Sequence, residues 1–186
     1  MVATPVRAAP AGIDVRAYGA AGNGHHIDTK AINAAIETAA AHGGGIVRIP
    51  PGDYLCHTIH LKDGITLYLE RGAILRAAPT EQFDLFQPNR WDRYQDFGHS
   101  HWHNSMICGV GVKDVAIAGP GMIVGDGLSR GEFSYASAKS GGADKIIALK
   151  ECKNVSLSGF TLTGSPHIAI LATGVNNLQI SRLLVD

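Results

Sequence analysis

Three short stretches of this chain repeat one pattern and decide its fold. They read DVAI at residues 114–117, NVSL at 154–157 and NLQI at 177–180. Each begins with Asp or Asn and continues with alternating apolar residues, which is the period of a β-strand. The second and third stretches lie 23 residues apart (154 to 177), whereas the first and second lie 40 apart (114 to 154). We interpret the longer spacing as one 23-residue unit that carries a loop of 17 residues.

The alignment of these stretches extends in both directions, and residues 63–67 (DGITL) form a weaker, earlier copy. The aligned columns are Ile107, Ile147 and Ile170; Val112, Cys152 and Val175; Gly119, Gly159 and Arg182; and Met122, Leu162 and Val185. Asn and Asp tolerate the left-handed backbone conformation, so they can turn the chain at the same place in successive repeats. The pattern therefore predicts a β-solenoid whose apolar residues stack inside. The Leu-x-x-Leu-x-Leu spacing of a leucine-rich repeat is missing.

A helix precedes the repeats. Asp28 is a candidate N-cap, residues 29–42 place apolar side chains on one face, and the glycines at 43–45 end the pattern. Short strands bounded by Gly, Asp or Pro follow, at residues 46–49, 54–56, 58–61, 65–69 and 73–75. The expected fold class is therefore all-β.

Composition excludes several classes of protein. The 186 residues contain 16 Lys and Arg against 16 Asp and Glu, and a net charge of zero argues against an electrostatic nucleic-acid binder. No apolar run approaches the roughly 20 residues of a membrane span. Cys56, Cys108 and Cys152 are too few for a disulfide framework and form no Cys-x-x-Cys pair, so we interpret them as small apolar residues.

The segment after residue 12 is similar to a known family. Residues 13–20 (IDVRAYGA), 22–24 (GNG), 43–45 (GGG) and 49–54 (IPPGDY) resemble the opening of the pectate-lyase-like superfamily of right-handed parallel β-helices. In that superfamily the amphipathic helix caps the N-terminal end of the solenoid. Lyases, hydrolases, epimerases and phage tailspikes share this opening, so it implies a fold and no single function.

Later segments narrow the resemblance to glycoside hydrolase family 28, the polygalacturonase family. They are NSMI at 104–107, GDGLSRG at 125–131 and HIAILATG at 167–174. The resemblance covers residues 13–78 and 104–186. Two departures are IVG at 123–125, where the family often has Ile-Asp-Gly, and Ile27, where it often has an acid.

Residues 1–12 are rich in Ala and Pro and contain no apolar signal-peptide core, so we interpret them as a disordered lead-in or as a mature N-terminus whose signal peptide has been removed. The resemblance implies that residues 13–186 are the N-terminal part of a single β-helix domain with an N-terminal capping helix. Residues 79–103 are expected to be an inserted loop.

The catalytic motifs of the family are missing from this chain. Inverting hydrolysis needs two carboxyl groups about 6.5–9.5 Å apart. The family supplies them and their neighbours in Asn-x-Asp, Asp-Asp, Gly-His-Gly and Arg-x-Lys motifs, none of which occurs here. In the family these motifs begin just after the coil that matches residues 175–186. We therefore expect the catalytic carboxylates beyond Asp186, a chain truncated at its C-terminus, and no activity of this piece alone.

Four residues are candidates for substrate binding: His103, Arg130, Lys150 and His167. His167 follows Ser165-Pro166 at a coil corner that lies near the groove in the family; otherwise it is a surface turn residue. Arg130 and Lys150 can pair with the carboxylates of an acidic sugar, or be solvated surface charges.

A histidine-rich segment contains His103. On a strand, the spacing His99-x-His101-x-His103 would direct three imidazoles to one side, and with Asp96 they could bind a metal. We favour a polar loop beside the groove, and expect no metal and no cofactor. The interleaved aromatic residues can stack on sugar rings or pin the loop to the solenoid; they are Trp91, Tyr94, Phe97 and Trp102.

The expected parent protein is a polygalacturonase-like, inverting glycoside hydrolase that cleaves a pectin-like, acidic polysaccharide. Two alternatives remain: a polysaccharide lyase of the same fold, and a glycan-binding β-helix without catalysis. We expect neither a nucleic acid nor a membrane as partner. The expected location is extracellular or periplasmic, although the chain as written contains no signal peptide.

Overall fold

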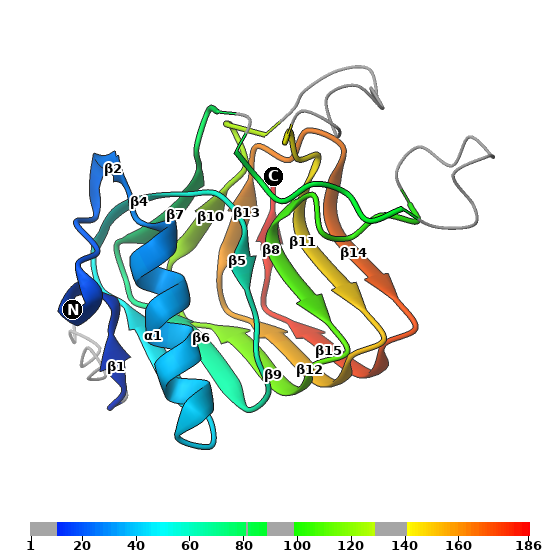
Figure 1. Cartoon of the computed structure of the whole chain (residues 1–186), viewed down its shortest axis with the longest axis horizontal. Helices are drawn as coiled ribbons and strands as arrows, with labels where there is room; N and C mark the ends of the chain where they lie inside the picture. Colours follow the sequence, from blue (N-terminus) through cyan, green and yellow to red (C-terminus); the bar gives the residue numbers. More distant parts are fainter. Residues whose placement is uncertain (1–10, 81, 89–98, 129–140) are drawn as a thin grey trace, which may run out of the picture.

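The computed structural model describes residues 11–80, 82–88, 99–128 and 141–186, and these form one α-helix, one 3₁₀ helix and a set of short strands (Figure 1). The elements are β1 (Ile13–Asp14), η1 (Val15–Tyr18), β2 (Asn23–Ile27), α1 (Thr29–Ala41), β3 (Gly45–Ile49), β4 (Gly52–Cys56), β5 (Ile59–His60), β6 (Ile65–Leu69), β7 (Ala73–Ala77), β8 (Ser105–Val110), β9 (Lys113–Ala118), β10 (Met122–Val124), β11 (Lys145–Lys150), β12 (Lys153–Ser158), β13 (Thr161–Thr163), β14 (Ile168–Thr173), β15 (Asn176–Ser181) and β16 (Leu184–Val185). Within these ranges no helix is long and apolar enough to cross a membrane.

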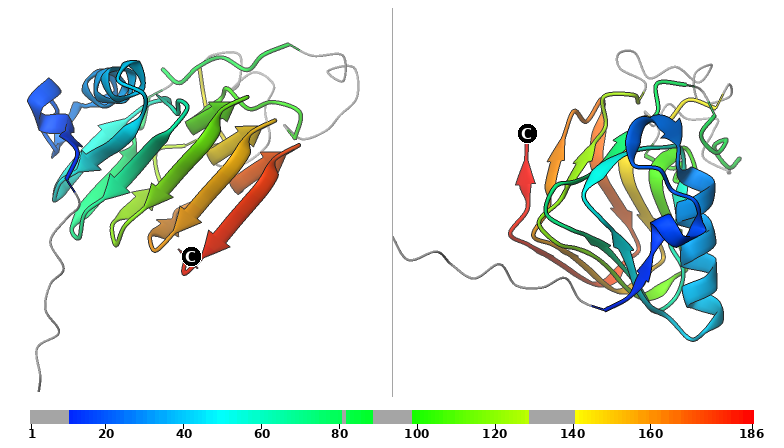
Figure 2. Two further views of the ribbon diagram at one scale, coloured as in Figure 1. Left: turned by 90° about the horizontal axis from the view of Figure 1, so that it is seen from below. Right: turned by 90° about the vertical axis from the view of Figure 1, so that its left-hand side faces the viewer.

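The strands form three parallel sheets. Sheet A contains β1, β3, β6, β9, β12 and β15; sheet B contains β2, β4, β7, β10, β13 and β16; sheet C contains β5, β8, β11 and β14. Neighbours in a sheet come from successive turns of the chain, so the strands wind into stacked coils (Figure 2). The predicted all-β, right-handed parallel β-helix is confirmed.

Ladders of apolar side chains fill the interior. In sheet C, Ile59 pairs with Ile107, which pairs with Ile147, which in turn pairs with Ile170. The first three of these isoleucines are fully buried. Burying one such side chain stabilises the fold by about 1.5–3 kcal/mol. The isoleucine column of the predicted repeat is thus an interior ladder.

The Asp and Asn column is also confirmed. Asp114, Asn154 and Asn177 have φ angles of 56°, 54° and 61°, which lie in the left-handed region. Their side chains form a hydrogen-bonded ladder: Asn154 Nδ2 donates to Asp114 Oδ1 at 2.8 Å, and Asn177 Nδ2 donates to Asn154 Oδ1 at 3.1 Å. In the earlier copy Gly64 occupies the matching position, with φ 70°. The same backbone turn therefore recurs in successive coils.

One predicted column is wrong by one residue. Leu162 pairs with Ile123 and not with Met122, although it does pair with Val185 as expected. Gly119 and Gly159 are equivalent positions, and the turn from Gly119 to β10 is one residue longer than the turn from Gly159 to β13. The insertion shifts β10 by one position.

Helix α1 ends one residue before the predicted boundary at 42. Its buried face packs against β3 and β5 at the N-terminal end of the solenoid (Figure 2). Asp28 occupies the N-cap position, as predicted, but its side chain makes no capping hydrogen bond to the helix. The buried carboxylate instead accepts hydrogen bonds from the backbone N–H groups of Ala21 at 2.7 Å and Gly22 at 3.0 Å. Asp28 therefore ties the preceding loop to the helix start.

Candidate functional site

One face of the solenoid combines outward-facing strand residues with long loops. In each strand of sheet C the residue that follows the interior isoleucine points outward, and these residues form one column along the sheet. A second outward column lies two residues further along β8, β11 and β14. The first column is His60, Cys108, Ala148 and Leu171; the second is Val110, Lys150 and Thr173. We call these seven residues the outer face of sheet C. The described residues that lead directly into β8 and β11, 99–104 and 141–144, lie at the ends where these strands begin, as do residues 164–167 before β14.

Trp102 lies against this outer face. Its Nε1 donates a hydrogen bond to Thr173 Oγ1 at 3.2 Å, and Lys150 Nζ lies 4.4 Å from the centre of its ring. The side chain of Gln87 holds the same segment, since its Oε1 accepts from the backbone N–H groups of Trp102 and His103 at 3.1 Å. Only 6% of Trp102 is exposed, so its ring pins the loop and offers little surface to a sugar. Trp91, Tyr94 and Phe97 lie outside the described residues.

The three imidazoles of the histidine-rich segment contact different neighbours. The ring of His99 stacks on that of His167, with centroids 5.9 Å apart, whereas His101 is buried edge-on against Phe86 at 4.6 Å. His103 lines a pocket. Residues 99–104 are not a strand, which agrees with the favoured interpretation of this segment as a loop and excludes the alternative in which a strand would direct the three imidazoles to one side. Among the described residues, which exclude Asp96, no group of three or more His, Cys, Asp or Glu could hold a metal ion.

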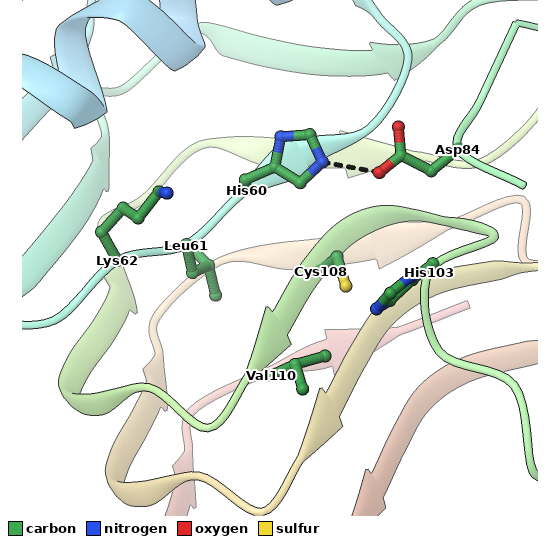
Figure 3. A pocket seen from close by; sticks show the side chains of 7 residues that line it. All are labelled: His60, Leu61, Lys62, Asp84, His103, Cys108 and Val110. Carbon is green, nitrogen blue, oxygen red and sulfur yellow. Dashed lines mark hydrogen bonds and ion pairs between the residues drawn. The ribbon is translucent and has the colours of Figure 1, made fainter. Parts of the chain in front are cut away.

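The pocket next to His103 is an open hollow of about 330 Å³ between β5 and β8 (Figure 3). The residues that line it are His60, Leu61, Lys62, Asp84, His103, Cys108 and Val110. Nε2 of His60 and Oδ2 of Asp84 lie 2.7 Å apart and are hydrogen-bonded. Each of these two side chains is 43% exposed, so both present polar atoms to the hollow.

Backbone contacts fix the His60–Asp84 pair in place. The backbone N–H of His60 donates to Oδ1 of Asn33, a residue of α1, at 2.9 Å. The backbone N–H of Asp84 donates to Thr58 Oγ1 at 3.0 Å. The helix and the strand at the N-terminal end of sheet C thus hold one side of the pocket.

Cys108 is not an activated nucleophile. Burial raises the pKa of its thiol to about 12, so the group remains protonated at neutral pH. A cysteine nucleophile needs the thiolate, and a pKa near or below neutrality supplies it. The pocket therefore offers hydrogen-bonding groups and apolar walls, and no thiolate.

A buried polar cluster lies where β8 and β11 begin. Asn104 Nδ2 donates to Asp144 Oδ1 at 3.1 Å, and the same carboxylate oxygen pairs with the ammonium of the fully buried Lys145. Paired and hydrogen-bonded charges are the form in which ionic groups are tolerated in a protein interior. The cluster joins the two segments that lead into sheet C.

The structure brings three of the four predicted binding residues to one face. His103 lines the pocket, Lys150 belongs to the outer face, and His167 immediately precedes β14. Arg130 lies outside the described residues. The sequence did not single out His60 or Asp84. The alternation in residues 58–61 could have placed His60 outward, but nothing local indicates its partner in a loop 24 residues away.

The sequence of this chain matches a known protein family and a named relative. A family model described as rhamnogalacturonase A/epimerase, pectate lyase-like, matches residues 12–106. The chain belongs to this family. It is also 27% identical over 174 residues to a Vitis vinifera protein named probable polygalacturonase, which agrees with the family 28 resemblance. That alignment covers 90% of this chain and 35% of the relative, so the chain spans about a third of the relative's length.

Solved structures share the fold at lower identity. A candidate glycosyl hydrolase from Parabacteroides merdae has a TM-score of 0.76 and 22% identity, over 95% of this chain and 75% of that chain. A family 28 exopolygalacturonase from Yersinia enterocolitica has a TM-score of 0.66 and 22% identity, over 95% of this chain and 40% of that chain. At this level of identity, the similarity establishes the β-helix fold and carries no conclusion about function.

Proposed function

We propose that the chain is part of a glycoside hydrolase acting on an acidic, pectin-like polysaccharide, and that the outer face of sheet C binds this polysaccharide. The observation that carries the proposal is that Lys150 lies on this face, one strand from Val110, and that His103 lines the open pocket to which Val110 belongs. The identity to a probable polygalacturonase supports the class of substrate.

Lys150 is the residue best suited to an acidic sugar. Its side chain is half-buried against Trp102, which fixes the direction of the ammonium without neutralising its charge. The neighbouring Val110 is 42% exposed and supplies an apolar surface for the C–H face of a ring. A positioned cation next to an apolar patch is suited to a uronate unit.

The proposal assigns no catalytic residue to these 186 residues. The reaction is hydrolysis with inversion, and its acid and base are expected in other parts of the whole protein. Because polysaccharides of this kind lie outside the cytoplasm, the proposed location is extracellular or periplasmic.

The test is calorimetric titration of the chain with oligogalacturonate. We expect Lys150→Met to weaken binding about tenfold or more, since a hydrogen bond to a charged group is worth about 1.5–3 kcal/mol. Methionine keeps an apolar stem against Trp102. The matched control is Lys153→Met, which removes an exposed charge from β12 in sheet A and should leave binding unchanged. Absence of binding, or equal affinities of the two variants, would refute the proposed binding face.

The reaction itself is tested with the whole protein and polygalacturonate. New reducing ends without ultraviolet absorption support hydrolysis. An unsaturated, ultraviolet-absorbing product indicates a lyase. Binding without product indicates a glycan-binding β-helix that has no catalytic activity.

A further inference from the structure

We propose that the pocket between β5 and β8 is a neighbouring subsite, sharing Val110 with the Lys150 position, that accepts a neutral sugar unit and disfavours a uronate. The inference rests on the proposed function, because it names the units that the outer face of sheet C distinguishes. It is carried by the pocket's lining and by the distribution of charge around it (Figure 3).

The lining matches the surface of a sugar ring. His60 and His103 supply imidazole nitrogens, and Asp84 supplies a carboxylate whose Oδ2 is held by His60, so that Oδ1 remains to accept from a ligand hydroxyl. Cys108 and Val110 form an apolar wall on the β8 side. The polar groups of the pocket can hydrogen-bond to sugar hydroxyls, and its apolar wall can pack on the C–H groups of the ring. A polar but uncharged ligand therefore fits this lining best.

The charges of the pocket oppose a second carboxylate. Lys62 is the lining residue with a permanent positive charge, and its Nζ pairs with Glu37 Oε1 at 2.8 Å. His60 offsets the charge of Asp84 only when the imidazole is protonated. A uronate in the pocket would therefore meet the Asp84 carboxylate as a like charge, whereas a neutral hexose would use the same carboxylate as a hydrogen-bond acceptor.

The pocket lies next to the proposed uronate position. Val110, which lines it, is the register partner of Lys150 on the neighbouring strand. Adjacent strands are about 4.8 Å apart, which is close to the size of one sugar unit. One glycan chain can therefore place an acidic unit at Lys150 and a neutral unit in the pocket.

Two probes that differ only at C6 test this inference: methyl galactoside and methyl galacturonide. Each is titrated into the full chain while the ring signals of His60 and His103 are followed by NMR at neutral pH, and the indole signal of Trp102 reports separately on the Lys150 position. We expect the galactoside to shift the two histidine signals, and the galacturonide to bind at the pocket at least about fivefold more weakly.

The charge variant Asp84→Asn keeps the shape of the pocket and removes its carboxylate. We expect it to reduce the preference for the neutral probe at least about threefold. Asp126→Asn is the control, because it removes the same charge from the segment after β10 of sheet B and should leave the preference unchanged.

Each outcome is decisive for one or both proposals. Equal binding of the two probes at the pocket, or a preference that Asp84→Asn does not change, overturns the neutral subsite. If oligogalacturonate binding still depends on Lys150, the proposed function survives that result. If neither probe nor oligogalacturonate binds, both proposals fail.

Discussion

At the scale of single residues, the left-handed turn positions connect side-chain choice to the shape of a coil. Asn154 combines a φ angle of 54° with hydrogen bonds to the coils on both sides. The left-handed conformation destabilises the backbone of most L-residues by about 1–2 kcal/mol. The cost is smaller for Asn and very small for Gly. The torsion and the hydrogen bonds can therefore be separated by two substitutions.

We predict that Asn154→Ala lowers the free energy of unfolding by about 2 kcal/mol, because it adds backbone strain and removes the side-chain ladder. Asn154→Gly removes only the ladder and should cost about half as much. Urea denaturation measures both. Equal losses for the two variants would show that the left-handed conformation is not the reason for Asn at this position.

Cys108 gives a prediction of pH dependence. Burial raises the pKa of its thiol to about 12, above its value in the unfolded chain, so the folded state keeps the proton longer. The contribution of this thiol to stability is present below about pH 8.5 and is lost as the pH rises toward 12. Burial also raises the pKa values of the Cys56 and Cys152 thiols, so the wild-type chain should become less stable in alkali.

The contribution of Cys108 is isolated by comparison with Cys108→Ala. At one pH unit above the pKa of the thiol in the unfolded chain, we expect the free energy of unfolding to have fallen by about 1 kcal/mol more in the wild type than in the variant. The readout is the urea midpoint between pH 7 and pH 10. Parallel curves for the two proteins would contradict the raised pKa.

At the scale of elements, the segment before α1 depends on one buried carboxylate. Asp28 accepts from two backbone N–H groups and contacts His26 Nδ1 at 2.8 Å. A buried amide left without its acceptor costs about 1–3 kcal/mol. The interaction closes the loop from η1 onto the helix.

We therefore expect Asp28→Ala to destabilise the chain by about 2–4 kcal/mol. On the same helix, Glu37→Ala removes an exposed ion pair with Lys62 and should cost less than about 1 kcal/mol. Thermal unfolding followed by circular dichroism compares the two. Similar effects of both substitutions would show that Asp28 is not the tie between loop and helix.

Elements that obey a local period were predictable, and those set by distant contacts were not. The isoleucine and asparagine columns follow from alternation and spacing, so the sequence indicated both. The register at Ile123 depends on one extra turn residue, which a fixed offset cannot show. The His60–Asp84 pair joins a strand to a loop outside the repeat, and the rings of His99 and His101 are directed by different partners, His167 and Phe86.

At the scale of the whole molecule, each coil buries its apolar residues only between its neighbours. Leu157 of β12 is fully buried and pairs with Ile117 on one side and Ile180 on the other. Truncation of such a residue leaves a cavity that affects the contacts on both sides.

Leu157→Ala should lower the free energy of unfolding by about 2–5 kcal/mol. The control is Leu85→Ala, since Leu85 is 59% exposed and should contribute less than about 0.5 kcal/mol. Urea denaturation of both variants makes the comparison. A small loss at Leu157 would show that the stacked interior is not the main source of stability.

The central claim is that the outer face of sheet C binds an acidic glycan, and a crystal structure of the chain with oligogalacturonate tests it most directly. We predict that the oligosaccharide lies across β8 and β11, with one carboxylate within hydrogen-bond distance of Lys150 Nζ. An oligosaccharide bound to the outer surface of sheet A or sheet B, with the outer face of sheet C unoccupied, would contradict the claim.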